Sequence, residues 1–101
     1  MKKLGILISC PPGHRNFQHG VELARTALAR GLRVYVYCID DAVNGIARDD
    51  IQSLKEQGVA LYGCAYSARC RILPIDDRAV YSGLTIVSDL LAATDKFVSF
   101  N

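Results

Sequence analysis

The four cysteines are the side chains of this sequence best suited to covalent chemistry. They are Cys10, Cys38, Cys64 and Cys70. A cysteine thiolate is a nucleophile and can carry sulfur, whereas a thiol in apolar surroundings behaves as a small packing residue. The chemistry of each cysteine therefore depends on where the fold places it.

Cys64 lies where a predicted strand gives way to a predicted helix. Gly63 lets the backbone turn sharply, and Ala65 begins a segment rich in small residues. A sulfur at such a junction faces unpaired main-chain N–H groups and the positive end of the helix dipole, which lower the thiol pKa from its usual value. Arg69 and Arg71 follow closely and add positive potential. Cys64 is the predicted nucleophile, and a packed structural thiol is the alternative.

The other cysteines have weaker claims. Cys10 and His14 lie in the loop after the first predicted strand, so both are secondary candidates at the same edge of the fold. His14 could act as a base or an anion ligand, although a solvated histidine at a helix start is the favoured interpretation. Cys38, inside a hydrophobic strand, and Cys70, on a helix, are interpreted as packing residues.

Several other chemistries lack their motifs. There is no C-x-x-C pair for a dithiol or zinc site, and no glycine-rich phosphate loop. The arginine of a Cys-x5-Arg phosphatase loop would stand at Cys70 or Asn16, so both loops miss it. The pairs Asp40-Asp41 and Asp76-Asp77 are typical of turns and helix caps rather than a metal cluster. We therefore expect no metal and no cofactor, and a flavodoxin-like nucleotide or flavin binder finds no support.

Length and composition limit the class of protein. With 101 residues, the chain is expected to form one domain spanning residues 1–101. Half of the residues are hydrophobic, 22% are charged, and the net charge is +2, which is too small to indicate binding to nucleic acid or an anionic membrane surface. The apolar stretch from Leu4 to Ser9, which ends next to Cys10, is too short for a lipoprotein signal or a membrane span. We expect a cytoplasmic protein with reduced thiols.

Strands and helices are expected to alternate along the chain. Apolar and β-branched runs predict strands over residues 4–9, 33–39, 59–63, 73–75 and 96–100. Helical spacing of apolar residues and capping signals predict helices over about 16–30, 49–57, 65–71 and 84–93, with a polar loop over 40–45. This order predicts an α/β fold: a three-layer domain with a mostly parallel five-stranded sheet and helices on both faces.

In such sheets, ligands bind outside the carboxyl ends of the strands. Four features meet this edge or follow it. The loop after the first strand leads into a long helix that ends at Gly31, and the second strand runs into Asp41-Ala42-Val43. Cys64 closes the third strand, and Gly83-Leu84 opens an apolar helix that contains Ser88-Asp89-Leu90-Leu91. In order and spacing, these features resemble the DsrE/TusD-like (DsrE/DsrF-like) sulfur-relay family over most of the chain.

The resemblance implies a fold that assembles into trimers or hexamers. It also implies that Cys64 carries sulfane sulfur as a persulfide between a sulfur donor protein and an acceptor protein. Arg69 and Arg71 would help to hold the thiolate or an acidic partner surface, with Cys10, His14 and Asp41 in support. A non-catalytic binding or assembly subunit is the alternative. Apolar surface left over on so short a chain, for instance at Tyr35, Tyr37, Tyr62 or Tyr81, independently favours a homo-oligomer.

Overall fold

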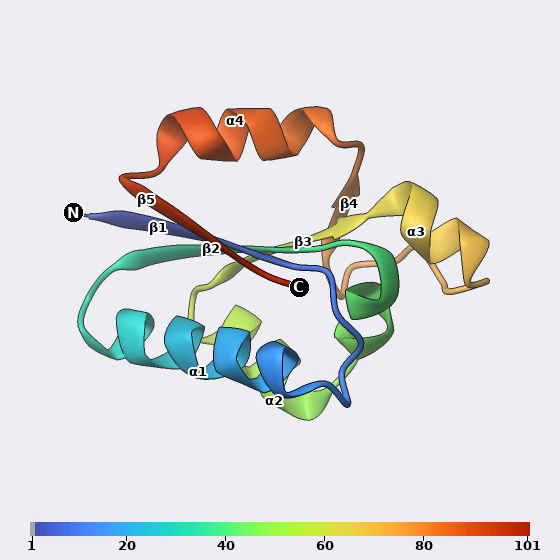
Figure 1. Cartoon of the computed structure of the whole chain (residues 1–101), viewed down its shortest axis with the longest axis horizontal. Coiled ribbons are helices and arrows are strands. Elements are labelled where there is room, and N and C mark those ends of the chain that lie inside the picture. The colour runs from blue at the N-terminus through green and yellow to red at the C-terminus, as the bar shows by residue number, and fades with distance from the viewer. Residues whose placement is uncertain (1) are drawn as a thin grey trace.

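Five parallel strands form the centre of the molecule (Figure 1). The computed structural model describes residues 2–101. The strands are β1 (Lys3–Ile8), β2 (Arg33–Cys38), β3 (Ala60–Cys64), β4 (Val80–Ser82) and β5 (Lys96–Phe100), in the sheet order β4-β3-β2-β1-β5. The helices are α1 (Arg15–Ala29), the 3-10 helix η1 (Asp40–Gly45), α2 (Asp49–Glu56), α3 (Ala65–Cys70) and α4 (Thr85–Ala93). All neighbouring strands run in the same direction. The predicted α/β fold class is confirmed.

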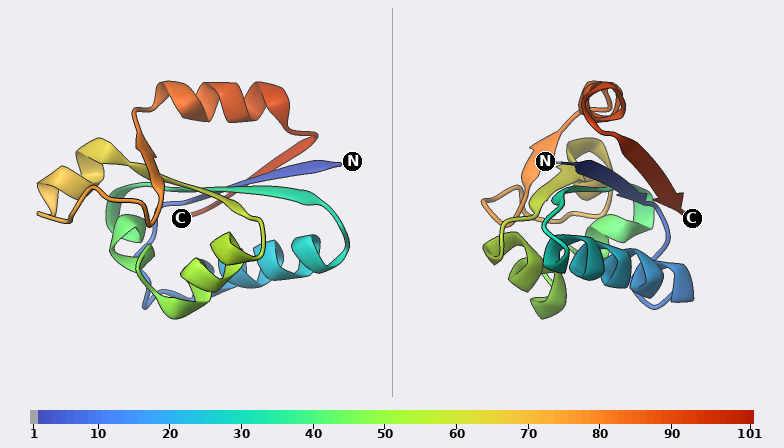
Figure 2. Two further views of the ribbon diagram at one scale, coloured as in Figure 1. Left: turned by 180° about the vertical axis from the view of Figure 1, so that it is seen from behind. Right: turned by 90° about the vertical axis from the view of Figure 1, so that its left-hand side faces the viewer.

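The two faces of the sheet are covered to different extents. Helices α1 and α2 lie on one face and α4 alone lies on the other, while α3 projects from one end of the molecule (Figure 2). The face toward α1 is closed by completely buried side chains such as Ile6, Ile8 and Val34. On the α4 face, residues such as Leu7 and Tyr62 are only partly buried. The α4 face therefore leaves more side-chain surface within reach of solvent.

Helix α1 packs closely on the sheet because of its small residues. Its buried stripe recurs at helical spacing and consists of Phe17, Gly20, Val21, Ala24 and Ala27. A methyl group at Gly20 would lie 2.8 Å from Ile8 and 3.3 Å from Phe100, so a larger residue here would force the Ile8 side chain to shift. The helix ends before Gly31, whose φ of 83° is a left-handed conformation that suits glycine.

The prediction of a strand over residues 73–75 was wrong, and the fourth strand is β4. Pro74 has no N–H to donate, and the Leu73 N–H donates instead to Ala68 O at the end of α3. The strand forms where Val80 and Tyr81 align with β3. The segment 40–45, predicted as a polar loop, forms η1. Its buried Ala42 and Val43 explain why it folds back onto the protein.

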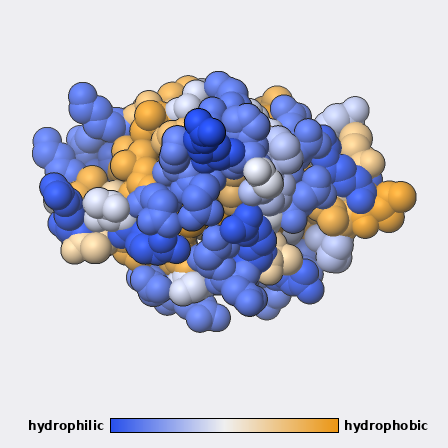
Figure 3. All heavy atoms as spheres, turned by 60° about the horizontal axis from the view of Figure 1, so that its bottom comes forward, coloured by the Kyte–Doolittle hydropathy of each residue, from blue (hydrophilic) through white to orange (hydrophobic). Residues whose placement is uncertain are grey.

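The exposed large hydrophobic side chains come from the last part of the chain. They are Tyr66, Ile72, Ile75, Val80, Leu84, Leu91 and Val98. By contrast, the outer surface of α1 and α2 is predominantly hydrophilic (Figure 3). Within residues 2–101, no helix has both the length and the apolar character needed to cross a membrane.

Candidate functional site

Cys64 is the last residue of β3 and the N-cap of α3, as the sequence predicted. Its Sγ accepts a hydrogen bond from the Ser67 N–H at 3.4 Å, so the sulfur takes the role that a serine or aspartate oxygen has in an ordinary N-cap. The residue is only 4% exposed. The single chain therefore encloses a sulfur that persulfide exchange would require to be accessible.

The strand register places Cys64 on the α4 side of the sheet. Cys38 on β2 aligns with Gly63, and Cys64 is one residue further along. Because side chains alternate between the faces, Cys64 points away from the face that holds Cys38. On β4 its partner in register is Ser82. Tyr37, next to Cys38, points to the same face as Cys64, and its hydroxyl lies 3.4 Å from both the Ser82 and the Gly83 carbonyl oxygens.

Ser67 is a buried polar residue in direct contact with the Cys64 sulfur. Its Oγ accepts a hydrogen bond from the Asp40 N–H at 3.0 Å, which leaves its own proton free to point at Cys64. Asp40 has a φ of 52°, a left-handed conformation that aspartate tolerates better than most residues. The turn at the end of β2 thus positions the Asp40 N–H as a donor to the Ser67 hydroxyl oxygen. Ser67 in its turn donates its own N–H to the Cys64 sulfur.

Hydrogen bonding outweighs burial in setting the acidity of this thiol. Burial alone would raise the pKa of Cys64, but the hydroxyl and N–H of Ser67 and the Tyr37 hydroxyl together lower the pKa of this thiol below its ordinary value. Burial raises the pKa of Tyr37 to about 12, and the nearby Cys64 adds to this effect. Tyr37 therefore stays protonated and available as a donor at neutral pH.

The predicted basic residues are arranged differently from one another. Arg71 pairs with Asp41 at 2.8 Å and donates to the Ser67 carbonyl oxygen at 3.1 Å. These contacts fasten the end of α3 to η1, so much of the positive charge of Arg71 is balanced by Asp41. Arg69 is exposed and, among residues 2–101, forms no ion pair. The sequence singled out Asp41 and Arg71 separately, and the structure brings them together.

Neither Cys10 nor His14 contributes to the hydrogen bonding of the Cys64 sulfur. Burial raises the pKa of Cys10, with a backbone hydrogen bond acting in the opposite direction, and its electrostatic neighbour is Cys38. His14 is the exposed N-cap of α1, where its Nδ1 accepts from the Asn16 N–H at 3.1 Å. No hydrogen bond described within residues 2–101 joins either residue to Cys64.

The two remaining cysteines have contrasting environments. Cys38 is completely buried, as expected for a packing residue, and its burial raises the pKa of the thiol to about 12. Cys70 is exposed, so its interpretation as a packed thiol was wrong. It is the last residue of α3.

Sequence reasoning missed three residues of the site. Ser67 had a detectable signal, because it stands three residues after the predicted N-cap, where a capping partner is expected. Tyr37 could have been assigned to the opposite face from Cys38 by strand alternation. Ser82 could not have been found, since its strand was placed elsewhere.

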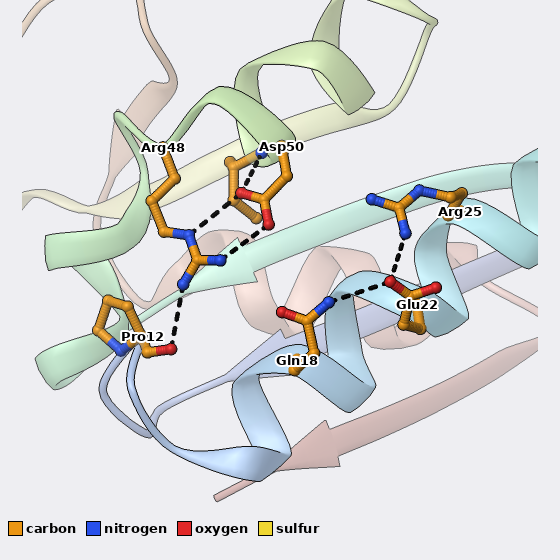
Figure 4. A network of polar contacts seen from close by, with 7 residues as sticks. Pro12, Gln18, Glu22, Arg25, Arg48 and Asp50 are labelled. Carbon is orange, nitrogen blue, oxygen red and sulfur yellow. Dashed lines mark hydrogen bonds and ion pairs between the residues drawn. The ribbon is translucent and has the colours of Figure 1, made fainter.

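A separate polar network fastens the loop after β1 to α2. Arg48 binds the Asp50 carboxylate at 2.9 Å and the Pro12 carbonyl oxygen at 3.1 Å (Figure 4). Its guanidinium also lies 5.2 Å from the centre of the Phe17 ring. Nearby, Glu22 accepts from Gln18 and Arg25 on the surface of α1. These contacts hold the scaffold and do not approach Cys64. Residues 2–101 contain no group of three or more side chains arranged to hold a metal ion.

Comparison with known proteins gives the family of this chain. The model of the DsrE/DsrF-like family matches residues 2–100. The YchN protein of E. coli has a similar structure, with a TM-score of 0.82 and 22% sequence identity over 99% of this chain and 100% of that chain. BT1422, a conserved protein of unknown function from Bacteroides thetaiotaomicron, has a TM-score of 0.81 and 17% identity over 98% of this chain and 95% of that chain. No curated protein matches. The two structures share the fold, and from the family match over nearly its whole length we conclude that the chain belongs to the DsrE/DsrF-like family.

Proposed function

We propose that this chain is a sulfurtransferase-like carrier that holds sulfane sulfur as a persulfide on Cys64. Membership of the DsrE/DsrF-like family suggests a sulfur-relay protein in general. The observation that carries the specific proposal is the sulfur at the strand–helix junction, which accepts a hydrogen bond from the Ser67 N–H, with the hydroxyls of Ser67 and Tyr37 also lowering the pKa of this thiol. A packed thiol needs none of these donors, whereas a thiolate nucleophile needs them to remain ionised when buried.

The transfer reaction requires no oxidant and no metal. The Cys64 thiolate attacks the outer sulfur of a donor persulfide, R–S–SH, and forms a new S–S bond. The S–S bond of the donor breaks, and the electron pair leaves with R–S⁻. Delivery reverses the roles, because an acceptor thiolate attacks the outer sulfur of the Cys64 persulfide and Cys64 departs as the thiolate. The donors around Cys64 therefore assist both its attack and its departure.

Access to the sulfur depends on α3. Cys64 is 4% exposed, and α3 packs on η1 and β3 with the Arg71–Asp41 pair at its end. Transfer requires α3 to move away from the end of β3 when a partner docks. Arg69 is exposed on this helix and carries a positive charge toward an acidic partner surface. Asp41 and Arg71 control how firmly the helix stays closed.

We also propose that the chain works as a homo-oligomer, a trimer or hexamer, with donor and acceptor proteins as its partners. Exposed Val80 on β4, Leu84 just before α4 and Leu91 on α4 supply apolar surface for such contacts. The four free cysteines fit a reducing compartment such as the cytoplasm. A monomer mass by light scattering at micromolar concentration would contradict the oligomer.

The test is persulfide loading followed by intact mass. The reduced Cys70→Ser protein, which lacks the exposed thiol, is treated with a sulfane sulfur donor. We expect an adduct of about 32 Da, the mass of one sulfur atom, that disappears in the Cys64→Ser variant and persists in a Cys38→Ser variant. Absence of the adduct, or its persistence without Cys64, would overturn the proposal.

A non-catalytic assembly subunit of the same fold is the second candidate. Burial of Cys64 together with the exposed apolar side chains of α4 favours it. An oligomer that forms normally but accepts no sulfur, even beside an active family member, would identify this function.

A further inference from the structure

Ser82 carries a buried hydroxyl that has no partner. Its Oγ is the side-chain atom within residues 2–101 that is enclosed yet forms no hydrogen bond. Buried hydroxyls are nearly always paired, so an orphan of this kind calls for a physical explanation such as a group that binds there during function.

The position of Ser82 connects this orphan to Cys64. The two residues are partners in register on the neighbouring parallel strands β4 and β3. Partners on adjacent parallel strands project from the same face of the sheet, and such strands lie about 4.8 Å apart. Tyr37 lies next to both residues, because its hydroxyl is 3.4 Å from the Ser82 carbonyl oxygen and contributes to lowering the pKa of Cys64.

A persulfide would give the Ser82 hydroxyl its partner. The inner sulfur, Sγ, already accepts a hydrogen bond from the Ser67 N–H. A second sulfur bonded to Sγ lies about 2.05 Å beyond it and needs a donor of its own. The free hydroxyl on the adjacent strand, with no competing acceptor, is suited to that purpose.

We propose that Ser82 binds the outer sulfur of the Cys64 persulfide by donating its hydroxyl proton as a hydrogen bond. The inference rests on the sulfur-carrier function proposed above. Ser82 forms no covalent bond to the sulfur, and its hydroxyl keeps its proton while the persulfide is bound. It stabilises the anionic persulfide, Cys64–S–S⁻, holds the outer sulfur in one orientation and delays its loss until an acceptor arrives.

The unloaded protein provides the first part of the test. Because the Ser82 hydroxyl has no partner there, a Ser82→Ala change should leave the melting temperature of the unloaded protein unchanged or slightly higher. Loading with sulfur should stabilise the wild type more than Ser82→Ala. Ser82→Thr, which keeps the hydroxyl, should behave as the wild type, and Ser99→Ala on the exposed strand β5 is the matched control.

The second part measures the bound sulfur itself, with all variants carrying Cys70→Ser. Cyanide removes the outer sulfur as thiocyanate and returns the Cys64 thiolate, so its rate against pH reports both the ionisation and the retention of the persulfide. We expect Ser82→Ala to lose sulfur about tenfold faster to cyanide at neutral pH and to show a higher pH midpoint, because a hydrogen bond to a charged sulfur is lost.

The outcomes separate the two proposals. If the wild type forms no persulfide on Cys64, the carrier function fails and the role of Ser82 fails with it. If the persulfide forms but Ser82→Ala matches the wild type in cyanide rate and pH midpoint, only the role of Ser82 is overturned. Equal destabilisation of the loaded and unloaded protein by Ser82→Ala would assign Ser82 a purely structural role and also overturn it.

Discussion

Cys38 and Cys64 end neighbouring strands but have opposite properties. They are offset by one residue in register, and this step places them on opposite faces of the sheet. Cys38 lies among apolar residues, and burial raises the pKa of its thiol to about 12. Cys64 is also buried, but the donors around it lower the pKa of its thiol. In this pair, the hydrogen-bond donors near the sulfur, and not the degree of burial, decide whether the pKa of the thiol is raised or lowered.

The two faces of the sheet differ in the same way as the two cysteines, one being apolar and the other carrying polar groups. The face covered by α1 and α2 encloses completely buried apolar side chains, including Cys38. The face covered by α4 carries Cys64, Tyr37 and Ser82, and Leu90 is the buried residue of that helix. The α1 and α2 face therefore consists mainly of apolar packing, whereas the α4 face combines the completely buried Tyr37 with polar groups next to Cys64.

The largest expected effect is on the free energy of unfolding, and it tests the difference between the two faces by shortening one leucine on each covering helix. Leu54 on α2 is 3% exposed and Leu91 on α4 is 54% exposed. Leu54→Ala should lower the free energy of unfolding by about 2–5 kcal/mol because it leaves a cavity, whereas Leu91→Ala should change it by less than about 0.5 kcal/mol.

Urea denaturation gives the free energy of unfolding of both variants, at protein concentrations low enough to keep the chain monomeric. Equal losses of stability would show that α4 closes its face as tightly as α2 does, and the comparison of the two faces would then be wrong.

A smaller effect is expected from the donors on the α4 face. Tyr37→Phe removes one hydroxyl near Cys64 and should raise the pKa of that thiol, with a loss of stability of about 1 kcal/mol. Ultraviolet absorbance of the thiolate against pH measures the shift in the Cys70→Ser background. Tyr62→Phe is the matched control, because Tyr62 aligns with Tyr37 on the adjacent strand. A shift of the same size in both variants would assign it to general packing rather than to the Tyr37 hydroxyl.

Most of the fold could be predicted from the sequence because its signals are local. The apolar run that became β1 and the helical spacing that became α1 are visible within single segments. The strand β4 could not be predicted, since it has only three residues and is defined by pairing with β3 rather than by its own composition.

The candidate site divides in the same way. Cys64 could be predicted because a glycine before it and small residues after it mark the strand–helix junction. Strand register brings Tyr37 and Ser82 to the same face of the sheet as Cys64, and this register depends on contacts between distant segments. The enclosure of Cys64 by α3 could not be predicted either, because it depends on the fit of the helix against η1.

The smallest expected effect is a pair of pH dependences of opposite sign. Because folding lowers the pKa of Cys64, the folded state favours the thiolate. Its contribution to stability is therefore present above the ordinary pKa of 9.0 and is lost as the pH falls through the lowered folded value. Because folding raises the pKa of Cys38 to about 12, the folded state favours the thiol. That contribution to stability is present below pH 9.0 and declines as the pH rises toward 12.

The free energy of unfolding measured against pH tests both signs. The stability of the wild type should increase relative to that of Cys64→Ser as the pH rises toward 9.0, and should decrease relative to that of Cys38→Ala above pH 9.0. Differences of the same sign for both cysteines would mean that the donors at Cys64 do not overcome its burial, and the contrast between the two thiols would disappear.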